Sequence, residues 1–353
     1  MSLEDMLGSL YRPENKSLKD NWFYEDAKGI HMFHMQREEN IPDDVRHLHP
    51  ASIGHAVSQD LKNWEEHQTA LHPGDKKVYV GGIGSGLTFA TGCTIQKDGK
   101  YFMFYTQRPI SEPNYQSISL ATSTDMENWQ QHENNPILTA DEKIYDMGRE
   151  KDCLRIVHAF RDPFVFHSNE WYMAFTGRDR RFKRAAERQG NARRGVYNGC
   201  IGLAKLKDWD KGEMAHWKLL PPLLSPGLFV EMEVPQLVHK DKMWYLFFST
   251  WSKGNCFREN GHQGGLYCYA SSTGLRGKYI PVNGNGLVMN MEELREKQGF
   301  DIYGVQIISR WPTDNKYAAM GWVDSTKDKK EVKRASPPLE IEINRLSVDW
   351  RFK

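Results

Sequence analysis

The segment Gly54-His-Ala-Val-Ser-Gln-Asp-Leu-Lys-Asn-Trp64 combines a short apolar stretch with a polar turn that ends on a tryptophan. Related segments recur further along: Ile118-Ser-Leu-Ala121 with Asp125-Met-Glu-Asn-Trp129, Ile201-Gly-Leu-Ala204 with Lys207-Asp-Trp209, and Tyr267-Cys-Tyr-Ala270 with Ser271-Ser-Thr-Gly-Leu275. The alanines of these four units are 65, 83 and 66 residues apart, and a basic insertion of 18 residues, 178–195, accounts for the longer interval. This nearly constant spacing indicates a repeat architecture.

An apolar strand, a polar turn and an aromatic strand precede each unit, which is the pattern of a β-hairpin. The five hairpins are Trp22-Phe-Tyr24 with Ile30-His-Met-Phe-His34, Cys93-Thr-Ile95 with Tyr101-Phe-Met-Phe-Tyr105, Phe164-Val-Phe166 with Trp171-Tyr-Met-Ala-Phe175, Gln236-Leu-Val238 with Trp244-Tyr-Leu-Phe-Phe248, and a fainter Val305-Gln-Ile-Ile308 with Tyr317-Ala-Ala-Met320. The sequence therefore predicts an all-β protein, a five-bladed β-propeller of four-stranded antiparallel blades around a central axial pocket. We expect residues 1–353 to form this single domain, with the insertion 178–195 in the third blade. A β-solenoid, the rival fold, would show a short period that is absent here.

The overall composition limits the possible partners. The chain has 47 basic and 46 acidic residues, a net charge of +1, and this balance gives no support for nucleic acid as a partner. No apolar run approaches the roughly 20 residues of a membrane helix, and nothing near the N-terminus reads as a signal peptide, so we expect a cytoplasmic protein. The five cysteines form no Cys-x-x-Cys pair, and no acidic cluster has calcium-loop spacing, so we expect no metal and no cofactor.

Three carboxylates stand at the start of predicted inner strands, the strands that line the channel of a propeller. Asp20 precedes the first strand of blade one, Asp162 that of blade three and Glu233 that of blade four. The repeat thus directs three acids from distant parts of the sequence at one pocket. Carboxylates crowded in this way shift one another's pKa, so that one stays protonated while another is ionised. Glycoside hydrolysis needs such a pair, which makes a carbohydrate the expected partner.

These residues resemble the five-bladed fructofuranosidases and levansucrases, the clan of invertases, inulinases and their relatives. Asp20-Asn-Trp22 is similar to the levansucrase nucleophile segment, Phe160-Arg-Asp-Pro163 to the Arg-Asp-Pro motif, and Glu233-Val-Pro-Gln236 to the segment that carries the general acid/base. The resemblance spans roughly residues 18 to 325. The Asn-Asp-Pro-Asn motif of invertases is absent, and we expect no C-terminal β-sandwich. The chain therefore resembles a divergent, single-domain member nearer the levansucrase branch.

The resemblance implies a retaining double displacement on a β-fructofuranoside. Asp20 would be the nucleophile, Glu233 the general acid/base and Asp162 the transition-state stabiliser. The resemblance and the repeat together suggest further substrate-binding residues in the pocket: Trp22, Arg161, Gln236, Tyr303 and His55.

Four alternatives remain open from the sequence. The chain could be an inverting arabinofuranosidase-like or xylosidase-like hydrolase, a sugar-binding propeller without catalysis, or a transglycosylase rather than a hydrolase. The fourth concerns the insertion 178–195, which is interpreted as a solvated loop or short surface helix and, less simply, as a cap that selects phosphorylated sugars through its arginines.

Overall fold

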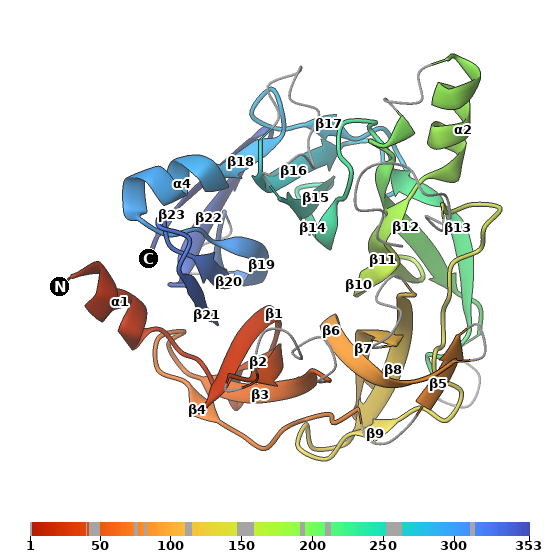
Figure 1. Ribbon diagram of the computed structural model, residues 1–353. Helices are drawn as coiled ribbons and strands as arrows, with labels where there is room; N and C mark the ends of the chain where they lie inside the picture. Colours follow the sequence, from red (N-terminus) through yellow and green to blue (C-terminus); the bar gives the residue numbers. More distant parts are fainter. Residues whose placement is uncertain are drawn as a thin grey trace.

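The computed structural model describes residues 2–39, 41, 50–73, 77–80, 83–109, 115–146, 159–190, 195–208, 213–251, 263–310 and 315–353. Its strands form five antiparallel sheets that stand in a ring about a central axis (Figure 1). This arrangement confirms the predicted five-bladed β-propeller. Each blade runs outward from an inner strand, and the blades follow one another in chain order.

The first two blades come from residues 16–131. Blade 1 contains β1 (Lys16–Asp26), β2 (Gly29–Glu38), β3 (Ser52–Ser58) and β4 (Glu65–Glu66). Blade 2 contains β5 (Lys77–Val80), β6 (Ile83–Lys97), β7 (Lys100–Pro109), β8 (Ser117–Ser123) and β9 (Gln130–Gln131). The inner strands of these blades are β1 and β6, and β5 pairs with the beginning of β6.

The last three blades complete the ring. Blade 3 contains β10 (Arg161–His167), β11 (Trp171–Arg178), β12 (Gly199–Leu206) and β13 (Trp217–Leu224). Blade 4 contains β14 (Glu233–Lys240), β15 (Met243–Thr250), β16 (Gly265–Ser271), β17 (Ile280–Pro281) and β18 (Leu287–Asn290). Blade 5 contains β19 (Tyr303–Arg310), β20 (Lys316–Ser325), β21 (Glu331–Ala335), β22 (Leu339–Asn344) and β23 (Ser347–Phe352). The four-stranded blade is thus the common unit, and β5, β18 and β21 are additions that the sequence pattern did not reveal.

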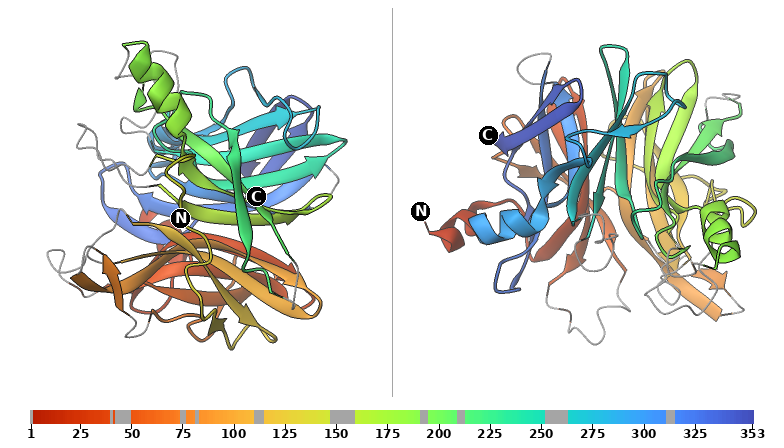
Figure 2. Two further views of the ribbon diagram at one scale, coloured as in Figure 1. Left: turned by 90° about the vertical axis from the view of Figure 1, so that its right-hand side faces the viewer. Right: turned by 90° about the horizontal axis from the view of Figure 1, so that it is seen from above.

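In the part of the chain that the structure describes, three helices lie outside the sheets: α1 (Leu3–Ser9), α2 (Arg180–Arg188) and α4 (Met291–Gln298). Helices α1 and α4 lie near each other beside blade 5, whereas α2 stands on the outside of blade 3 (Figures 1 and 2). Helix α2 falls within the basic insertion, so the simpler prediction of a short surface helix is confirmed there. Asp179 caps its N-terminus by accepting hydrogen bonds from the backbone N–H groups of Arg181 and Phe182. Among the described residues, no helix has the length and apolar character needed to cross a membrane.

The repeated Asp-x-x-Asn-Trp segments form the same turn in blades 1 and 2. The carboxylate of Asp60 accepts hydrogen bonds from the backbone N–H groups of Lys62 and Asn63, and the carboxylate of Asp125 does the same two and three residues on. The indole N–H groups of Trp64 and Trp129 each donate to the carbonyl oxygen three residues back. The motif recurs because each residue type has a defined task in this turn.

The hydrophobic core divides into five clusters, and each lies between two neighbouring blades. Blades 1 and 5 close the ring at a seam where Asn21 Nδ2 donates to the carbonyl oxygen of Gly321 over 3.1 Å. Because both faces of a blade are buried in such seams, the inner strands need apolar or fully hydrogen-bonded side chains on either side. Unpaired polar side chains can therefore be accommodated only at the ends of the inner strands that face the central axis.

Candidate active site

All five inner strands contain a β-bulge close to the axis. The pairing register shifts between Lys19 and Trp22, Ala90 and Gly92, Arg161 and Phe164, Glu233 and Gln236, and Tyr303 and Gln306. In four of them a residue inside the bulge has a positive φ: Asp20 (53°), Asp162 (56°), Val234 (51°) and Gly304 (59°). A bulge re-aims the side chains around it, and left-handed backbone at residues other than glycine is uncommon. The bulges therefore set which residues face the axis.

The registers correct one detail of the sequence analysis. Asp20 and Asp162 occupy the same place in their bulges, but the residue equivalent to them in blade 4 is Val234. Glu233 precedes that residue and is instead equivalent to Arg161 in blade 3. The three acids therefore reach the axis from two kinds of position, and Arg161 and Glu233 can lie beside each other on neighbouring strands.

Asp162 is buried and held by both of its neighbouring blades. Its carboxylate oxygen Oδ2 accepts hydrogen bonds from the Thr176 hydroxyl over 2.7 Å and from the backbone N–H of Val234 over 3.1 Å. Its backbone N–H donates to Thr106 Oγ1 of blade 2 over 2.9 Å. A carboxylate held in this way keeps one orientation, which suits a group that binds or stabilises rather than one that attacks.

Arg161 connects the acids. One of its terminal nitrogens lies 2.6 Å from Glu231 Oε2 and 3.4 Å from Glu233 Oε1, and its Nε lies 3.4 Å from Asp162 Oδ2. The other terminal nitrogen donates to Gln116 Oε1 over 3.2 Å. A single guanidinium thus faces three carboxyl groups. Its positive charge stabilises the ionised form of each one, most strongly where the distance is shortest.

Glu231 and Glu233 have opposite pKa shifts. Burial acts to raise the pKa of Glu231, but the charge of Arg161 and its hydrogen bond outweigh burial and leave that pKa below its ordinary value. Burial, assisted by the negative charges of Glu231 and Asp162, outweighs Arg161 at Glu233 and holds the pKa of this carboxyl well above its ordinary range. The opposite shifts favour the state with Glu231 as the carboxylate and Glu233 as the carboxylic acid, the condition in which Glu233 can donate a proton.

Asp20 differs from Glu231 and Glu233 in having no direct partner for its carboxylate among the described residues. Its carboxylate makes no hydrogen bond or ion pair with any residue in the described part of the chain. Burial raises its pKa to about 6, against the opposing charge of Lys19, and the carboxylate of Asp162 adds to the rise. The positive charges of Arg161 and Arg108 also act on it. Near neutral pH Asp20 is mostly ionised and unengaged, which are the properties of a nucleophile.

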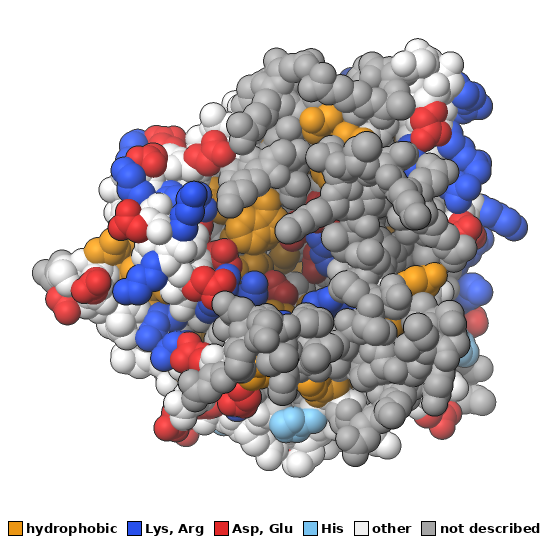
Figure 3. Space-filling model, in the orientation of Figure 1, with side chains coloured by type: hydrophobic (Ala, Val, Ile, Leu, Met, Phe, Trp, Pro, Cys, Tyr) orange, Lys and Arg blue, Asp and Glu red, His pale blue; other side chains and the backbone are white. Residues whose placement is uncertain are grey.

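Tyr303 belongs to the same cluster. Burial raises the pKa of its hydroxyl well above the ordinary value, and the negative charge of Glu233 is the next cause. Its ring stacks on Trp251 with the centroids 3.9 Å apart and the planes inclined by 18°. The view along the axis shows acidic, basic and apolar side chains together in the hollow at the centre of this face (Figure 3). Such a mixture suits a sugar, which has both hydroxyl groups and an apolar face.

The structure does not bring Trp22 and Gln236 into this cluster. Trp22 is fully buried, its indole N–H donates to Thr94 Oγ1 over 3.1 Å, and its ring stacks on Phe33 between blades 1 and 2. Both ends of the Gln236 amide bind the backbone of Ile307, at 2.7 and 2.6 Å. Since Trp22 is enclosed between two blades and the Gln236 amide is paired with the backbone of the next blade, the expectation that they bind sugar is corrected: they join neighbouring blades.

His55 also lies elsewhere. It is on β3, 1% exposed, and its ring stacks on Phe33 with the centroids 4.5 Å apart. Its hydrogen-bond partner is His31, a residue of the outer part of blade 1, and no residue of the acid cluster contacts it. The expectation that His55 binds substrate is therefore corrected as well.

Several residues of the site were not predicted from the sequence. Glu231 lies two residues before Glu233, and this Glu-Met-Glu spacing could have drawn attention to it. Lys19 and Arg108 affect the pKa of Asp20, and Thr106 and Thr176 orient Asp162. No sequence signal identifies the threonines, because their role arises from strands that become neighbours only in the folded ring.

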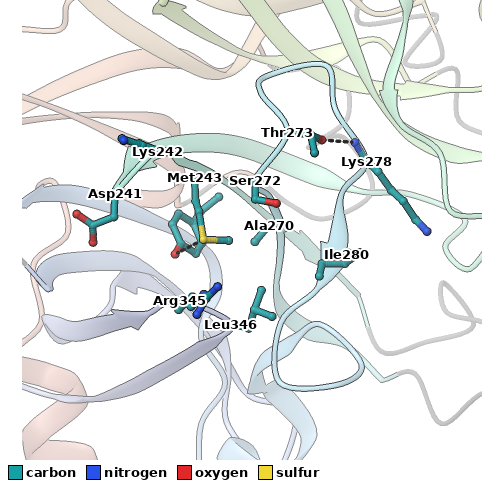
Figure 4. Close-up of a pocket in the computed structure, with 11 residues that line it drawn as sticks. Asp241, Lys242, Met243, Ala270, Ser272, Thr273, Lys278, Ile280, Arg345 and Leu346 are labelled. Carbon is teal, nitrogen blue, oxygen red and sulfur yellow. Dashed lines mark hydrogen bonds between the residues drawn. The ribbon is translucent and has the colours of Figure 1, made fainter.

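A hollow of about 620 Å³ lies away from these acids, between blades 4 and 5 (Figure 4). Its lining includes Met243, Thr273, Ile280 and Arg345. The acid at its edge, Asp241, lies 2.5 Å from Lys240 Nζ. None of the acids of the axial cluster is among the described residues that line this hollow.

The fold and the motifs have relatives among known proteins. The chain is 26% identical over 313 residues to the extracellular sucrase of Zymomonas mobilis subsp. mobilis, which covers 77% of this chain and 70% of that protein. It is 35% identical over 148 residues to the levansucrase of Rahnella aquatilis, or 37% of this chain and 34% of that protein. The name of the Zymomonas protein contradicts the cytoplasmic location expected from the sequence, and that expectation is withdrawn.

Solved structures agree on the fold. An inulosucrase from Halalkalicoccus jeotgali bound to kestose superposes with a TM-score of 0.69 at 19% identity, covering 97% of this chain and 89% of that one. The β-fructofuranosidase catalytic domain of Microbacterium saccharophilum K-1 gives 0.70 at 20% identity, covering 96% and 81%. The profile of the glycoside hydrolase family described as Levansucrase/Invertase matches residues 84–345. The chain therefore belongs to the levansucrase/invertase family of glycoside hydrolases.

Proposed function

We propose that this enzyme cleaves a terminal β-fructofuranosyl unit by a retaining double displacement, with residues 1–353 acting as one catalytic domain. Family membership makes the chain a glycoside hydrolase or transglycosylase of the fructofuranoside-acting class. The roles of individual residues are the proposal. Asp20 attacks the anomeric carbon, Glu233 protonates the departing oxygen, and Asp162 stabilises the positive charge that develops on the sugar ring.

This assignment rests on the different environments of the three acids. Glu233 has a raised pKa and so holds the proton that a leaving group needs. Asp20 has no partner among the described residues and is available to attack. Asp162 is held by Thr176 and Val234, so it can face the charged transition state without moving. After the sugar is attached to Asp20, the ionised Glu233 takes a proton from water or from an acceptor hydroxyl.

A substrate panel tests the proposal. The purified enzyme is incubated with sucrose, a fructan, a 4-nitrophenyl arabinofuranoside and a 4-nitrophenyl xyloside, and the released sugars are followed by chromatography and NMR. The expected result is release from the fructosides alone, with a β-configured first product. An inverted product, or release from the arabinofuranoside alone, would favour the inverting hydrolase instead. Activity on none of the substrates would favour a sugar-binding propeller.

The same reaction separates hydrolysis from transfer. With sucrose as substrate, hydrolysis releases glucose and free fructose in equal amounts, whereas transfer retains fructose in larger saccharides. The ratio of the two free sugars as the sucrose concentration rises therefore measures how the fructosyl enzyme divides between water and sugar acceptors.

A further inference from the structure

Four side chains with metal-binding chemistry meet at the outer seam between blades 1 and 2, far along the blades from the catalytic acids. His31 is on β2, His55 on β3, and His67 follows β4. Glu127 comes from the turn between β8 and β9 of blade 2. Glu127 Oε1 lies 2.7 Å from His67 Nδ1, and Glu127 Oε2 lies 4.0 Å from His55 Nδ1.

The hydrogen bonds fix which atom of His55 carries a proton. Asp26 Oδ1 lies 3.1 Å from His31 Nε2 and, as a carboxylate, accepts the proton of that nitrogen. In a neutral His31 the other nitrogen, Nδ1, is then the acceptor, and His55 Nε2 donates to it over 2.9 Å. His55 Nδ1 is therefore left with a bare lone pair.

This lone pair has no partner within the described residues. His55 is 1% exposed, its Nδ1 is buried, and the carboxylate oxygen Oε2 of Glu127 lies 4.0 Å from that nitrogen. The lone pair of His55 Nδ1 is unfavourable where it stands, since a buried polar atom without a partner costs free energy, and the carboxylate opposite it offers no proton. A cation between them would satisfy both.

We propose that His55, His67 and Glu127 bind a zinc-class divalent metal ion that fastens blade 1 to blade 2. One ligand atom from each lies within 4.8 Å of the other two. Zinc–ligand distances of about 2.0–2.1 Å place tetrahedral ligands about 3.4 Å apart, so a small inward movement completes the shell. His67 and Glu127 are partly exposed and can make this movement, and water can supply a fourth ligand. Imidazole nitrogens favour zinc over calcium or magnesium.

The surroundings resemble those of known zinc sites. A metal-binding histidine commonly donates its second ring nitrogen to a further group that fixes its orientation. Here His55 donates to His31, which in turn donates to Asp26. These two hydrogen bonds, from His55 to His31 and from His31 to Asp26, hold His55 in the tautomer whose Nδ1 can bind a metal.

The repeat provides a built-in comparison. His132 in blade 2 stands 65 residues after His67, and it also faces a glutamate of the next blade, with His132 Nε2 3.6 Å from Glu213 Oε2. The residue 65 positions after His55 is Leu120, however, so this second place has two ligands instead of three. The difference gives a matched control on the same protein.

The test is metal binding by the full chain, purified without a polyhistidine tag and stripped of metal with a chelator. Zinc affinity is measured by competition with a chromogenic chelator, and cobalt is added separately to record the visible absorption of a nitrogen- and oxygen-ligated ion. We expect one zinc per chain and a higher melting temperature with zinc. His67→Ala should weaken zinc binding at least about tenfold and Asp26→Asn by about 10–100-fold, whereas His132→Ala should leave it unchanged.

Two results would overturn the proposal. One is a wild-type protein that takes up no zinc and shows no cobalt absorption. The other is equal zinc affinity in the wild type and the His67→Ala variant, which would place any bound metal elsewhere. Far-ultraviolet circular dichroism of each variant checks that the propeller remains folded, and Glu127→Gln provides a second variant at a partly exposed position if His67→Ala does not fold.

Discussion

Two regions of the same inner strands, the bulges at the axis and the residues just beyond them, have opposite roles. Asp20 lies in a bulge and faces the axis, whereas Trp22, two residues on, is fully buried in the seam with blade 2. In blade 4, Glu233 lies at the bulge, whereas Gln236 binds the backbone of Ile307 in blade 5. Residues that are neighbours in a sequence motif thus divide between catalysis and assembly.

The position of a residue relative to the bulge, rather than its place in a sequence motif, therefore decides its role. A regular strand would alternate its side chains between two faces, but the bulge breaks this alternation at one point. In blade 5 the bulge position cannot carry an acid. Its bulge residue, Gly304, has a positive φ, and a β-carbon there would overlap the indole ring of Trp322. Blade 5 therefore supplies Tyr303, the preceding residue, in place of an acid.

The largest effect is expected at the bulge of blade 1. Asp20→Asn removes the attacking carboxylate and keeps its shape, so kcat/KM on a fructoside should fall at least about 10³-fold with the fold intact. Trp22→Phe, two residues away, is the matched control and should keep kcat/KM within a few-fold of wild type. Steady-state kinetics on both variants checks the contrast, and comparable losses in the two would refute it.

At the bulge of blade 4 the expected loss depends on the substrate. Glu233→Gln removes the proton donor and should lower kcat about 10²–10⁴-fold on sucrose. A fructoside with a better leaving group needs less protonation, so its first step should suffer far less. Burst and steady-state measurements on both substrates check this. Equal losses on the two substrates would remove Glu233 from the role of acid.

A seam residue should affect stability instead. Gln236→Leu leaves the buried N–H and carbonyl groups of Ile307 unpaired, which should reduce the free energy of unfolding by about 2–4 kcal/mol. Gln68→Leu, which removes an exposed hydrogen bond to the carbonyl oxygen of Glu127, should cost less than about 0.5 kcal/mol. Urea unfolding measures both. A Gln236→Leu protein with wild-type stability but without activity would show instead that Gln236 binds the substrate.

The smallest effect concerns the pH dependence of the site. Because Asp20 must be ionised to attack and its pKa is raised to about 6, kcat/KM should fall as the pH drops through that value. The charge of Lys19 lowers the pKa of Asp20, so Lys19→Met should move this acidic limb to higher pH by about one unit. A pH–rate profile checks the direction, and a shift to lower pH would contradict it.

The comparison also shows what the sequence could predict. The period of the Asp-x-x-Asn-Trp turns and the alternation of the hairpins predicted the five blades, because each turn residue performs a local task. Asp20, Asp162, Glu233, Arg161 and Tyr303 were predicted together because the repeat places them at the axial ends of inner strands. The structure brings all five into one cluster.

The features that the sequence did not predict depend on contacts between neighbouring blades. Trp22 and Gln236 were assigned to substrate because a sequence motif does not show which way a bulge turns a strand. His55 was assigned to it because the sequence does not show that β3 buries this ring against Phe33. Glu231 was missed because it precedes its strand. The histidines of blade 1 gave no sign of a metal site, since the third ligand, Glu127, comes from the next blade. Such cross-blade groups are visible only in the closed ring.

The role of Asp20 as the nucleophile is best tested by identifying the residue that carries the sugar in the covalent intermediate. The Glu233→Gln variant is mixed with a fructoside that has a good leaving group, quenched in acid and analysed by peptide mass spectrometry. Double displacement predicts that the peptide containing Asp20 gains one anhydrohexose unit, because the second step is slow without the base. An adduct on Glu231 or Asp162, or turnover with no adduct on any residue, would contradict the assignment of Asp20 as the nucleophile.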